Sequence, residues 1–163
     1  MTQPVPFKTS LMTVKPEWTD YNGHMNMAYY SVLFDLGADE VYPLIGFGPD
    51  YRTARGHTTY TAEFHISYIR ELHEGSKVWS TFQLVDHNDR SFHTYQELFH
   101  EDGWLAATGE ALGLHIDMSG PRVAPFLEDI AARIGAMHRA HSVLGRPARA
   151  GRFGWKAQLP TVM

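Results

Sequence analysis

Apolar and polar residues alternate along three long stretches in the second half of the chain. These stretches cover residues 77–86, 91–100 and 104–117. Alternation with a period of two is typical of strands that bury one face. The polar segments DHNDR and HEDG lie between the stretches and predict tight turns. The pattern therefore predicts an antiparallel meander, with further strands expected at residues 7–15 and 60–69.

A different periodicity covers residues 27–45, where apolar residues recur at intervals of three and four. The recurring positions are Tyr30, Leu33, Gly37, Val41 and Leu44, with Phe34 and Leu36 widening the apolar face. A face this wide is typical of a largely buried helix. The segment PLIGFGPD, rich in proline and glycine, is expected to end it. Pro125, followed by apolar Ile130, Ile134 and Met137, predicts a shorter amphipathic helix near the C-terminus.

This order of elements predicts an α+β fold in one domain spanning residues 1–163, with a core at about 7–117 and a C-terminal helix and tail at 118–163. Glycines in or beside the strands suit a sheet that bends around the long helix; they are Gly75, Gly103, Gly109 and Gly113. A small curved sheet leaves an open edge that a second copy of the chain can cover. We therefore expect a homodimer or a larger homo-oligomer such as a tetramer.

Composition narrows the class of protein. The chain has 163 residues, a net charge of -4 and no cysteine, which excludes disulfides and cysteine metal sites. The negative charge argues against a nucleic-acid partner, and no segment is apolar enough to span a membrane. The N-terminus does not resemble a secretory signal, so we expect a soluble, cytoplasmic protein. The basic cluster of Arg146, Arg149 and Arg152 is interpreted as a surface tail, with phosphate binding as the alternative.

The stretch TDYNGHMNMAYY, residues 19–30, holds the most chemically useful group of side chains, directly before the long helix. Asp20 is ionised at neutral pH and can act as a nucleophile or as a general base. Asn26 is placed to cap the helix, and Gly23 permits a tight turn and a close approach of the chain to a bound substrate. The first amides of a helix lack intrahelical acceptors and attract negative charge. The stretch can therefore be a simple capped turn or an active site.

The pattern D-x-x-G-H-M-N before a buried helix resembles the hotdog fold and, within it, the 4-hydroxybenzoyl-CoA thioesterase-like acyl-CoA thioesterases. The matching residues are Asp20, Gly23, His24 and Asn26, with Tyr29 or Tyr30 in the helix, and a second matching stretch is HISYIRELHEG. Together these motifs cover most of residues 7–117. Two further stretches, FDLGADEVY and GWLAATGEALGLHIDM, resemble a branch associated with carnitine breakdown, whose proposed substrate is betainyl-CoA.

The resemblance implies an acyl-CoA thioesterase that needs no cofactor and takes a coenzyme A thioester as substrate. Asp20 would be the nucleophile or the general base, and either role remains open. Backbone amides around residues 26–28 would stabilise the oxyanion, with Met27 as the first choice. His24 would orient Asp20 or a water molecule, although it could equally be structural. Asn26 would start the helix that carries the oxyanion site.

Residues outside this stretch complete the candidate site. Tyr68 ends the expected strand within the second motif and is expected to contact substrate. Glu63 is a second candidate carboxylate or a solvent-facing residue. Arg70 and Arg90 could bind the phosphates of coenzyme A, because guanidinium groups suit phosphate oxygens. The rings of Trp18, Tyr21 and Trp104 could face a quaternary ammonium group. We name these three residues the sequence-predicted aromatic set.

A metal site, a hydratase and a non-catalytic regulator are the alternatives to a thioesterase. The pairs His65 with His73 and His138 with His141 have no carboxylate-completed ligand set, so no metal site is predicted. An enoyl-thioester hydratase or dehydratase on the same fold is one alternative, but its D-x-N-x-x-H motif fails here by one residue. A non-catalytic acyl-CoA-binding regulator is the other, and the chain lacks the basic face or DNA-binding helix pair that such a regulator would normally bring.

Overall fold

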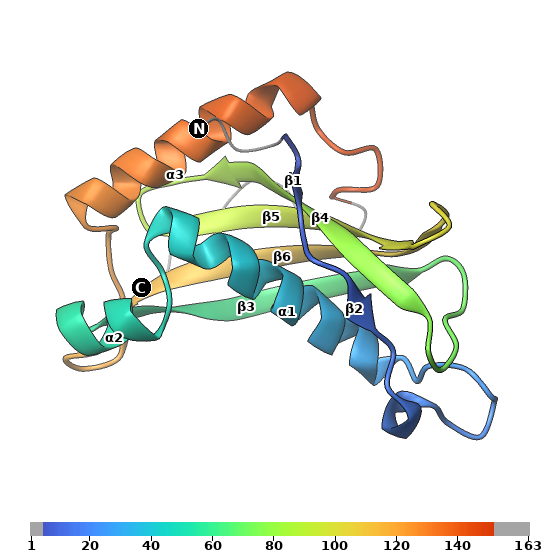
Figure 1. Ribbon diagram of the computed structural model, residues 1–163. Helices are drawn as coiled ribbons and strands as arrows, with labels where there is room; N and C mark the ends of the chain where they lie inside the picture. Colours follow the sequence, from blue (N-terminus) through green and yellow to red (C-terminus); the bar gives the residue numbers. More distant parts are fainter. Residues whose placement is uncertain (1–4, 152–163) are drawn as a thin grey trace.

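A computed structural model of the chain, which describes residues 5–151, contains an antiparallel sheet with a long helix lying across one face (Figure 1). In chain order the elements are β1 (Phe7–Lys8), β2 (Met12–Thr13), a 3-10 helix (Pro16–Trp18), α1 (Ala28–Ile45), α2 (Pro49–Arg55), β3 (His57–Tyr68), β4 (Lys77–His87), β5 (Ser91–His100), β6 (Leu105–Asp117), β7 (Arg122–Val123), α3 (Glu128–His141) and a second 3-10 helix (Ser142–Leu144). None of the helices in the described residues is long and apolar enough to cross a membrane.

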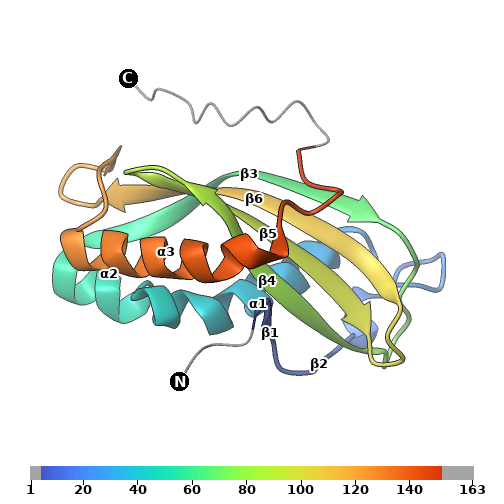
Figure 2. The same cartoon turned by 90° about the horizontal axis from the view of Figure 1, so that it is seen from above.

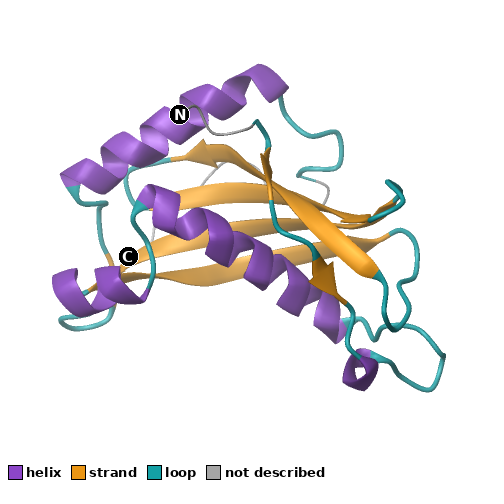
Figure 3. Ribbon diagram, viewed as in Figure 1, coloured by secondary structure: helices purple, strands orange, loops and turns teal. Residues whose placement is uncertain are grey.

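The sheet is built on the meander that the alternating pattern predicts. Its main path runs β1-β4-β5-β6-β3, while β2 also pairs with β4 and β7 with β6. Every pairing is antiparallel, and β5 has the predicted bounds. In the described part of the chain β3 pairs only with β6, so one edge of β3 is open. Figure 3 shows the helices gathered around the curved sheet.

The helix α1 is buried against the sheet, as its wide apolar face predicts. The Gln96 side chain of β5 donates to the Phe34 carbonyl oxygen at 3.1 Å. The Phe34 ring meets Phe64 of β3 edge to face, with 5.8 Å between ring centroids. At Gly37 the helix comes so close to the sheet that a Cβ atom would lie 2.5 Å from the Ser80 hydroxyl oxygen. These contacts fix the helix, and with it the helix start, relative to the strands.

The long helix α1 ends at Ile45, as predicted, because Gly46 of the segment PLIGFGPD adopts the αL conformation, while Pro43 lies inside the last turns of the helix. Other predicted boundaries are wrong. The short helix α2 was not predicted, because seven residues carry too little periodicity to show a face. The expected strand at 7–15 is two short strands, β1 and β2. Pro125 precedes α3 instead of standing in its first turn, since the helix begins at Glu128.

The end of the described chain covers the face of the sheet that points away from α1. After α3 the chain crosses to that side of the sheet (Figure 2). The Gln83 side chain donates to the Gly145 carbonyl at 2.8 Å, and the Gly151 N–H donates to both Glu110 carboxylate oxygens at 2.8 and 2.9 Å. Glu110 is buried beside His93 at 2.7 Å.

These contacts correct the interpretation of the basic cluster as a surface tail. Residues 145–151 pack on the sheet, although Arg146 within them is exposed, and Arg152 lies outside the described residues.

Candidate active site

The polar loop before α1 is anchored at both ends by buried side chains. Trp18 and Met25 both belong to the core cluster that also includes Tyr30 and Leu72. The Met25 N–H donates to the Leu72 carbonyl at 2.7 Å, and Thr19 and Met25 form an isolated antiparallel bridge. Residues 20–24 therefore protrude from a fixed base, which gives the polar side chains between them defined positions.

A tight turn places the Asp20 carboxylate. The Gly23 N–H donates to the Asp20 carbonyl at 3.0 Å, and the Asn22 N–H donates to Asp20 Oδ1 at 2.9 Å. Gly23 has a φ of 80°, a backbone conformation that glycine adopts readily and that residues with a Cβ atom rarely adopt. The expected tight turn at Gly23 is therefore confirmed. Tyr21, at the tip of the turn, is 98% exposed.

The Asn26 side chain joins this turn to the start of α1. Its Oδ1 accepts a hydrogen bond from the Ala28 N–H at 3.0 Å, while its Nδ2 donates to Asp20 Oδ2 at 3.0 Å. The first bond is the expected cap on the first turn of the helix. The second bond was not anticipated from the sequence, although an amide side chain always has a donor to offer besides its acceptor. Asn26 thus holds the carboxylate and the helix start together.

The hydrogen bonds to Asp20 also keep it ionised. The Asn22 N–H, followed by the Asn26 amide, lowers the pKa of the Asp20 carboxyl below its ordinary value of 3.8. Both donors favour the charged form, because a carboxylate accepts hydrogen bonds more strongly than a carboxylic acid does. At neutral pH the side chain is therefore an anion, the form that a nucleophile or a general base requires.

Of the three amides considered for the oxyanion, only one is available. The Asn26 N–H donates to the Trp18 carbonyl at 2.9 Å, and the Ala28 N–H is taken by the Asn26 side chain. Within residues 5–151 the Met27 N–H has no acceptor, and Met27 is 64% exposed. The Met27 carbonyl accepts from the Tyr68 hydroxyl at 3.2 Å, which ties this peptide to the end of β3.

A cavity of about 300 Å³ opens beside the helix start, and we call it the helix-start cavity. Its walls come from the loop, α1 and the end of β3; they are His24, Met25, Met27, Tyr30, Tyr68, Ile69, Arg70 and Glu71. The Arg70 guanidinium lies 4.1 Å from the centroid of the Trp104 ring. The fold therefore brings together Asp20, His24, Asn26 and Met27 from the loop with Tyr68 and Arg70 from the end of β3, two places that lie far apart in the sequence.

The His24 ring does not form a hydrogen bond with the Asp20 side chain. Its Nδ1 lies 3.5 Å from the Met25 carbonyl, and its ring meets His73 edge to face at 6.4 Å. Asp20 and His24 are joined through the backbone, where the Asp20 N–H donates to the His24 carbonyl at 3.2 Å. His73, considered in the sequence only as a metal candidate, contacts the Gly23 carbonyl through Nδ1 at 3.0 Å and so supports the loop.

Two of the sequence-predicted residues lie elsewhere in this chain. Glu63 follows a bulge in β3 and neighbours Phe64, whose ring faces α1, so Glu63 points to the opposite face of the sheet. Arg90 precedes β5, whereas the site lies near its far end, roughly 30 Å away for a strand of this length. Arg90 is also paired with Asp89 at 2.7 Å. Neither residue meets Asp20 within one chain.

The sequence-predicted aromatic set does not form a binding box. Trp18 is buried and stacks on Tyr29, with 5.5 Å between centroids. Trp104 is sandwiched between His100, stacked at 4.5 Å, and the Arg70 guanidinium. Tyr21 points into solvent. Trp18 and Tyr21 flank Asp20 in the sequence, but packing against Tyr29, His100 and Arg70 occupies the ring faces of the two tryptophans that a cation would need.

No group of three or more His, Asp or Glu side chains in residues 5–151 is arranged to hold a metal ion.

Comparison with known proteins agrees with this geometry. The family model described as the thioesterase-like superfamily matches residues 14–134. A betainyl-CoA thioesterase of Pseudomonas aeruginosa is 36% identical over 140 residues, which is 85% of this chain and 88% of that protein. An L-carnitine dehydrogenase/betainyl-CoA thioesterase of Rhizobium sp is 32% identical over 86% of this chain, but the match spans 28% of that longer protein.

Among solved structures, a hypothetical protein of Staphylococcus aureus in complex with CoA superimposes with a TM-score of 0.84. It is 26% identical, and the match covers 98% of both chains. The superfamily match begins just before the polar loop and ends within α3, so it includes the loop, the buried helix and the sheet. The chain therefore belongs to the thioesterase-like superfamily and is a thioester hydrolase with the hotdog fold.

Proposed function

We propose that the chain hydrolyses betainyl-CoA to betaine and coenzyme A, with Asp20 as nucleophile or general base and the Met27 N–H as oxyanion donor. The observation that carries the mechanism is the Asn26 side chain, which bonds Asp20 and the helix start at 3.0 Å each. A carboxylate and a free amide are thereby held on one short segment. The substrate is proposed from the 36% identical relative that bears this name.

The reaction needs one base and one site for negative charge. In the general-base route Asp20 takes a proton from water as the water oxygen attacks the thioester carbonyl carbon. In the nucleophile route Asp20 attacks that carbon itself, and water then hydrolyses the resulting anhydride. In both routes the carbonyl oxygen gains charge at the Met27 N–H, the carbon–sulfur bond breaks and coenzyme A leaves as the thiolate. Neither route calls for a metal or a further cofactor.

Arg70 is our choice for contacting the phosphates of coenzyme A. It lines the helix-start cavity and is exposed, and the Trp104 ring supports one face of its guanidinium group. The edge donors of a stacked guanidinium remain free to bind phosphate oxygens. Arg90, already paired with Asp89 at the far end of the sheet, is not included in this proposal.

The hydratase and regulator alternatives have less support. A hydratase of the kind considered above needs a carboxylate and a histidine acting as a pair, but Asp20 and His24 are joined only through the backbone. Five relatives are named as betainyl-CoA thioesterases, and four of these names also include an L-carnitine dehydrogenase.

A substrate panel tests the proposed reaction. With free-thiol detection, we expect betainyl-CoA to be hydrolysed with a kcat/KM roughly tenfold or more above that for 3,3-dimethylbutyryl-CoA, its neutral isostere. The factor corresponds to about 1.4 kcal/mol, within the range for binding a cation at aromatic and charged groups. Acetyl-CoA and benzoyl-CoA serve as further controls. Equal efficiency on the charged and neutral isosteres would rule out betainyl-CoA as the preferred substrate.

We also propose that the chain acts as a homodimer joined along β3. One edge of β3 is open in the described residues, and apolar side chains there and on the neighbouring face of α1 are exposed. They are Tyr60, Phe64 and Tyr68 of β3 with Val32 and Leu36 of α1. An open strand edge flanked by apolar surface favours pairing with another copy.

Light scattering of the purified protein tests this assembly. We expect a mass that is twice the chain mass of 18.5 kDa, or four times if dimers pair further. A mass of one chain at micromolar concentration would contradict pairing through β3.

A further inference from the structure

The acyl group of a betainyl thioester carries a positive charge, and the helix-start cavity sets the place of that charge. One methylene separates the nitrogen of this group from the carbonyl carbon, a distance of about 2.5 Å. A carbonyl oxygen that accepts from the Met27 N–H puts the cationic nitrogen within about 7 Å of the Met27 nitrogen. Met27 lines the helix-start cavity of about 300 Å³, so the charged head lies there.

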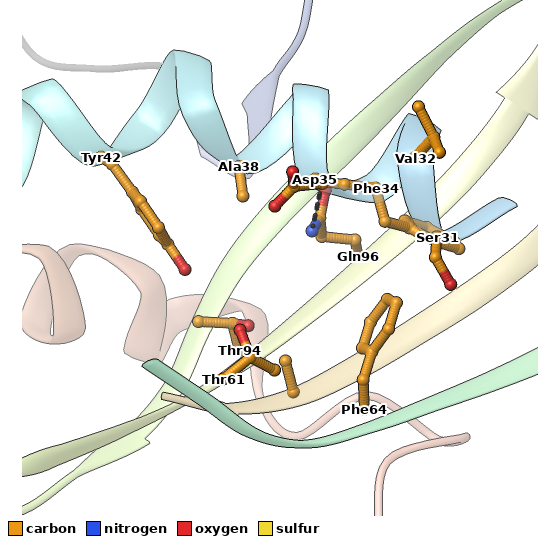
Figure 4. Close-up of a pocket in the computed structure, with 11 residues that line it drawn as sticks. Ser31, Val32, Phe34, Asp35, Ala38, Tyr42, Thr61, Phe64, Thr94 and Gln96 are labelled. Atoms are coloured by element: carbon orange, nitrogen blue, oxygen red, sulfur yellow. Dashed lines mark hydrogen bonds between the residues drawn. The ribbon is translucent and has the colours of Figure 1, made fainter. Parts of the chain in front are cut away.

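A second cavity, of about 310 Å³, lies under α1 but too far along the helix to hold this group (Figure 4). Two polar residues that line it, Asp35 and Tyr42, are about 12 and 22 Å beyond Met27 along the helix axis. Figure 4 also shows the Asp35 carboxylate turned away from the Ser31 end of the cavity. The charged head of so short an acyl group therefore stays in the helix-start cavity.

The walls beside Met27 suit a cation that cannot donate hydrogen bonds. The Tyr30 and Tyr68 rings both line the helix-start cavity and meet edge to face, with 5.0 Å between their centroids. The Tyr68 hydroxyl donates to the Met27 carbonyl at 3.2 Å, which fixes this ring beside the proposed oxyanion donor. Aromatic rings attract cations, and a trimethylammonium group is apolar at its surface, so it can pack against these rings.

The Glu71 side chain lines the same cavity from the segment that follows β3. The backbone of this segment is fixed on both sides of Glu71. Before it, the Arg70 N–H donates to the Ala106 carbonyl at 3.0 Å. After it, the carbonyl of the fully buried Leu72 accepts from the Met25 N–H at 2.7 Å. The Glu71 side chain therefore starts from a fixed point on the cavity wall, opposite the start of α1.

Glu71 brings a negative charge to the α1 side of the cavity. Within residues 5–151 its carboxylate forms no ion pair. Burial raises the pKa of the Tyr30 hydroxyl, and the nearby Glu71 charge adds to that shift. Arg70, its neighbour in the sequence, is instead held on the β6 side, where the guanidinium lies 4.1 Å from the centroid of the Trp104 ring. A cation beside the tyrosine rings would therefore meet the carboxylate.

We infer that Glu71 is the counter-charge for the cationic head of the acyl group in the helix-start cavity and so determines the preference for a cationic over a neutral acyl group. The inference rests on the proposed function. A carboxylate attracts a cation at short range even where water reaches both groups. A neutral acyl group of the same shape gains nothing from that charge, so Glu71 discriminates between the two substrates.

The test is the variant Glu71→Gln in the full-length chain. Its readout is the ratio of kcat/KM for betainyl-CoA to kcat/KM for 3,3-dimethylbutyryl-CoA, which separates recognition of the charge from effects that both substrates share. Removing the carboxylate charge is expected to lower this ratio about three- to tenfold, and reversing it with Glu71→Lys should lower the ratio further. Because Glu71 is exposed, both variants should keep the fold and the assembly, as thermal melts and light scattering would verify.

Glu74→Gln is the matched control, since Glu74 is an exposed carboxylate on the same segment and does not line the cavity. It should leave the ratio nearly unchanged. If wild type prefers betainyl-CoA and the Glu71 variants keep that preference, or if Glu74→Gln lowers it equally, Glu71 is not the counter-charge while the proposed function stands. If wild type itself shows no preference, the proposed substrate is wrong, and the inference is overturned with it.

Discussion

Replacing Asp20 by Asn is expected to reduce kcat for acyl-CoA hydrolysis by about 10²- to 10⁴-fold, the usual contribution of a general base. The amide cannot take a proton and is a poor nucleophile. The turn should persist, because the Gly23 N–H bond to the Asp20 carbonyl and the buried Trp18 and Met25 anchors do not involve the carboxylate. Thiol release under substrate saturation measures the effect.

The control for this experiment is Asp50→Asn, which makes the same chemical change at an exposed position on α2. Its activity should equal that of wild type. Light scattering and thermal melts should show the same assembly and stability for wild type and both variants. Hydrolysis by Asp20→Asn at the wild-type rate would remove Asp20 from the mechanism.

The pH dependence of kcat/KM also tests the assignment of Asp20 as the catalytic carboxylate. The ionised form of Asp20 is the active one, and hydrogen bonds from Asn22 and Asn26 lower its pKa from 3.8. Activity that depends on Asp20 is therefore present at pH values above its lowered pKa and is lost only as the pH falls through that pKa. We expect kcat/KM to stay level from neutral pH down to about pH 5 on this account. An acid limb centred near pH 6 would point to a histidine instead.

Replacing Gly113 by Ala is expected to destabilise the protein by about 1–3 kcal/mol, the usual cost of overpacking a core. Gly113 of β6 stands opposite Phe92 of β5, and a Cβ atom there would lie within 2.2–2.6 Å of the Phe92 ring. That ring cannot move away freely, because Phe47 and Phe126 pack around it at 5.6 and 6.4 Å. For a chain of this size the midpoint of thermal unfolding should fall by several degrees.

Gly120→Ala is the matched control for that substitution. Gly120 lies in the turn after β6, and nothing stands within 4 Å of the position its Cβ would occupy. The same added methyl group should therefore leave stability nearly unchanged. Equal melting temperatures for Gly113→Ala and wild type would mean that the Phe92 ring does not rest on Gly113.

Local patterns in the sequence predict the elements that depend on neighbouring residues. The long strands and the buried helix appear in it because alternation and a spacing of three to four follow directly from strand and helix geometry. The motif around Asp20 was visible for a similar reason, since the turn, the glycine and the capping asparagine lie within a few residues. A seven-residue helix such as α2 was missed because so short a segment displays no face.

Tertiary structure decided which side chains meet. Glu63 and Phe64 are adjacent in β3 and so point to opposite faces of the sheet, but only the pairing of β3 with β6, shifted by a bulge before Glu63, decides which of the two faces α1. Trp18 and Trp104 are near the site, but packing against Tyr29 and His100 occupies their ring faces. Such outcomes depend on register and on packing between distant segments, which no local pattern encodes.

The same holds for the parts of the site that carry the proposals. That the Met27 N–H is free follows only from seeing its neighbours bonded to Trp18 and Asn26. That Glu71 borders the cavity beside Met27 follows only from the contact of the segment after β3 with the polar loop. The residue types near Asp20 indicated which chemical groups are present. Contacts between distant segments determine which of these groups stay without a hydrogen-bond or ion-pair partner and can therefore act on a substrate, and these contacts exist only in the folded chain.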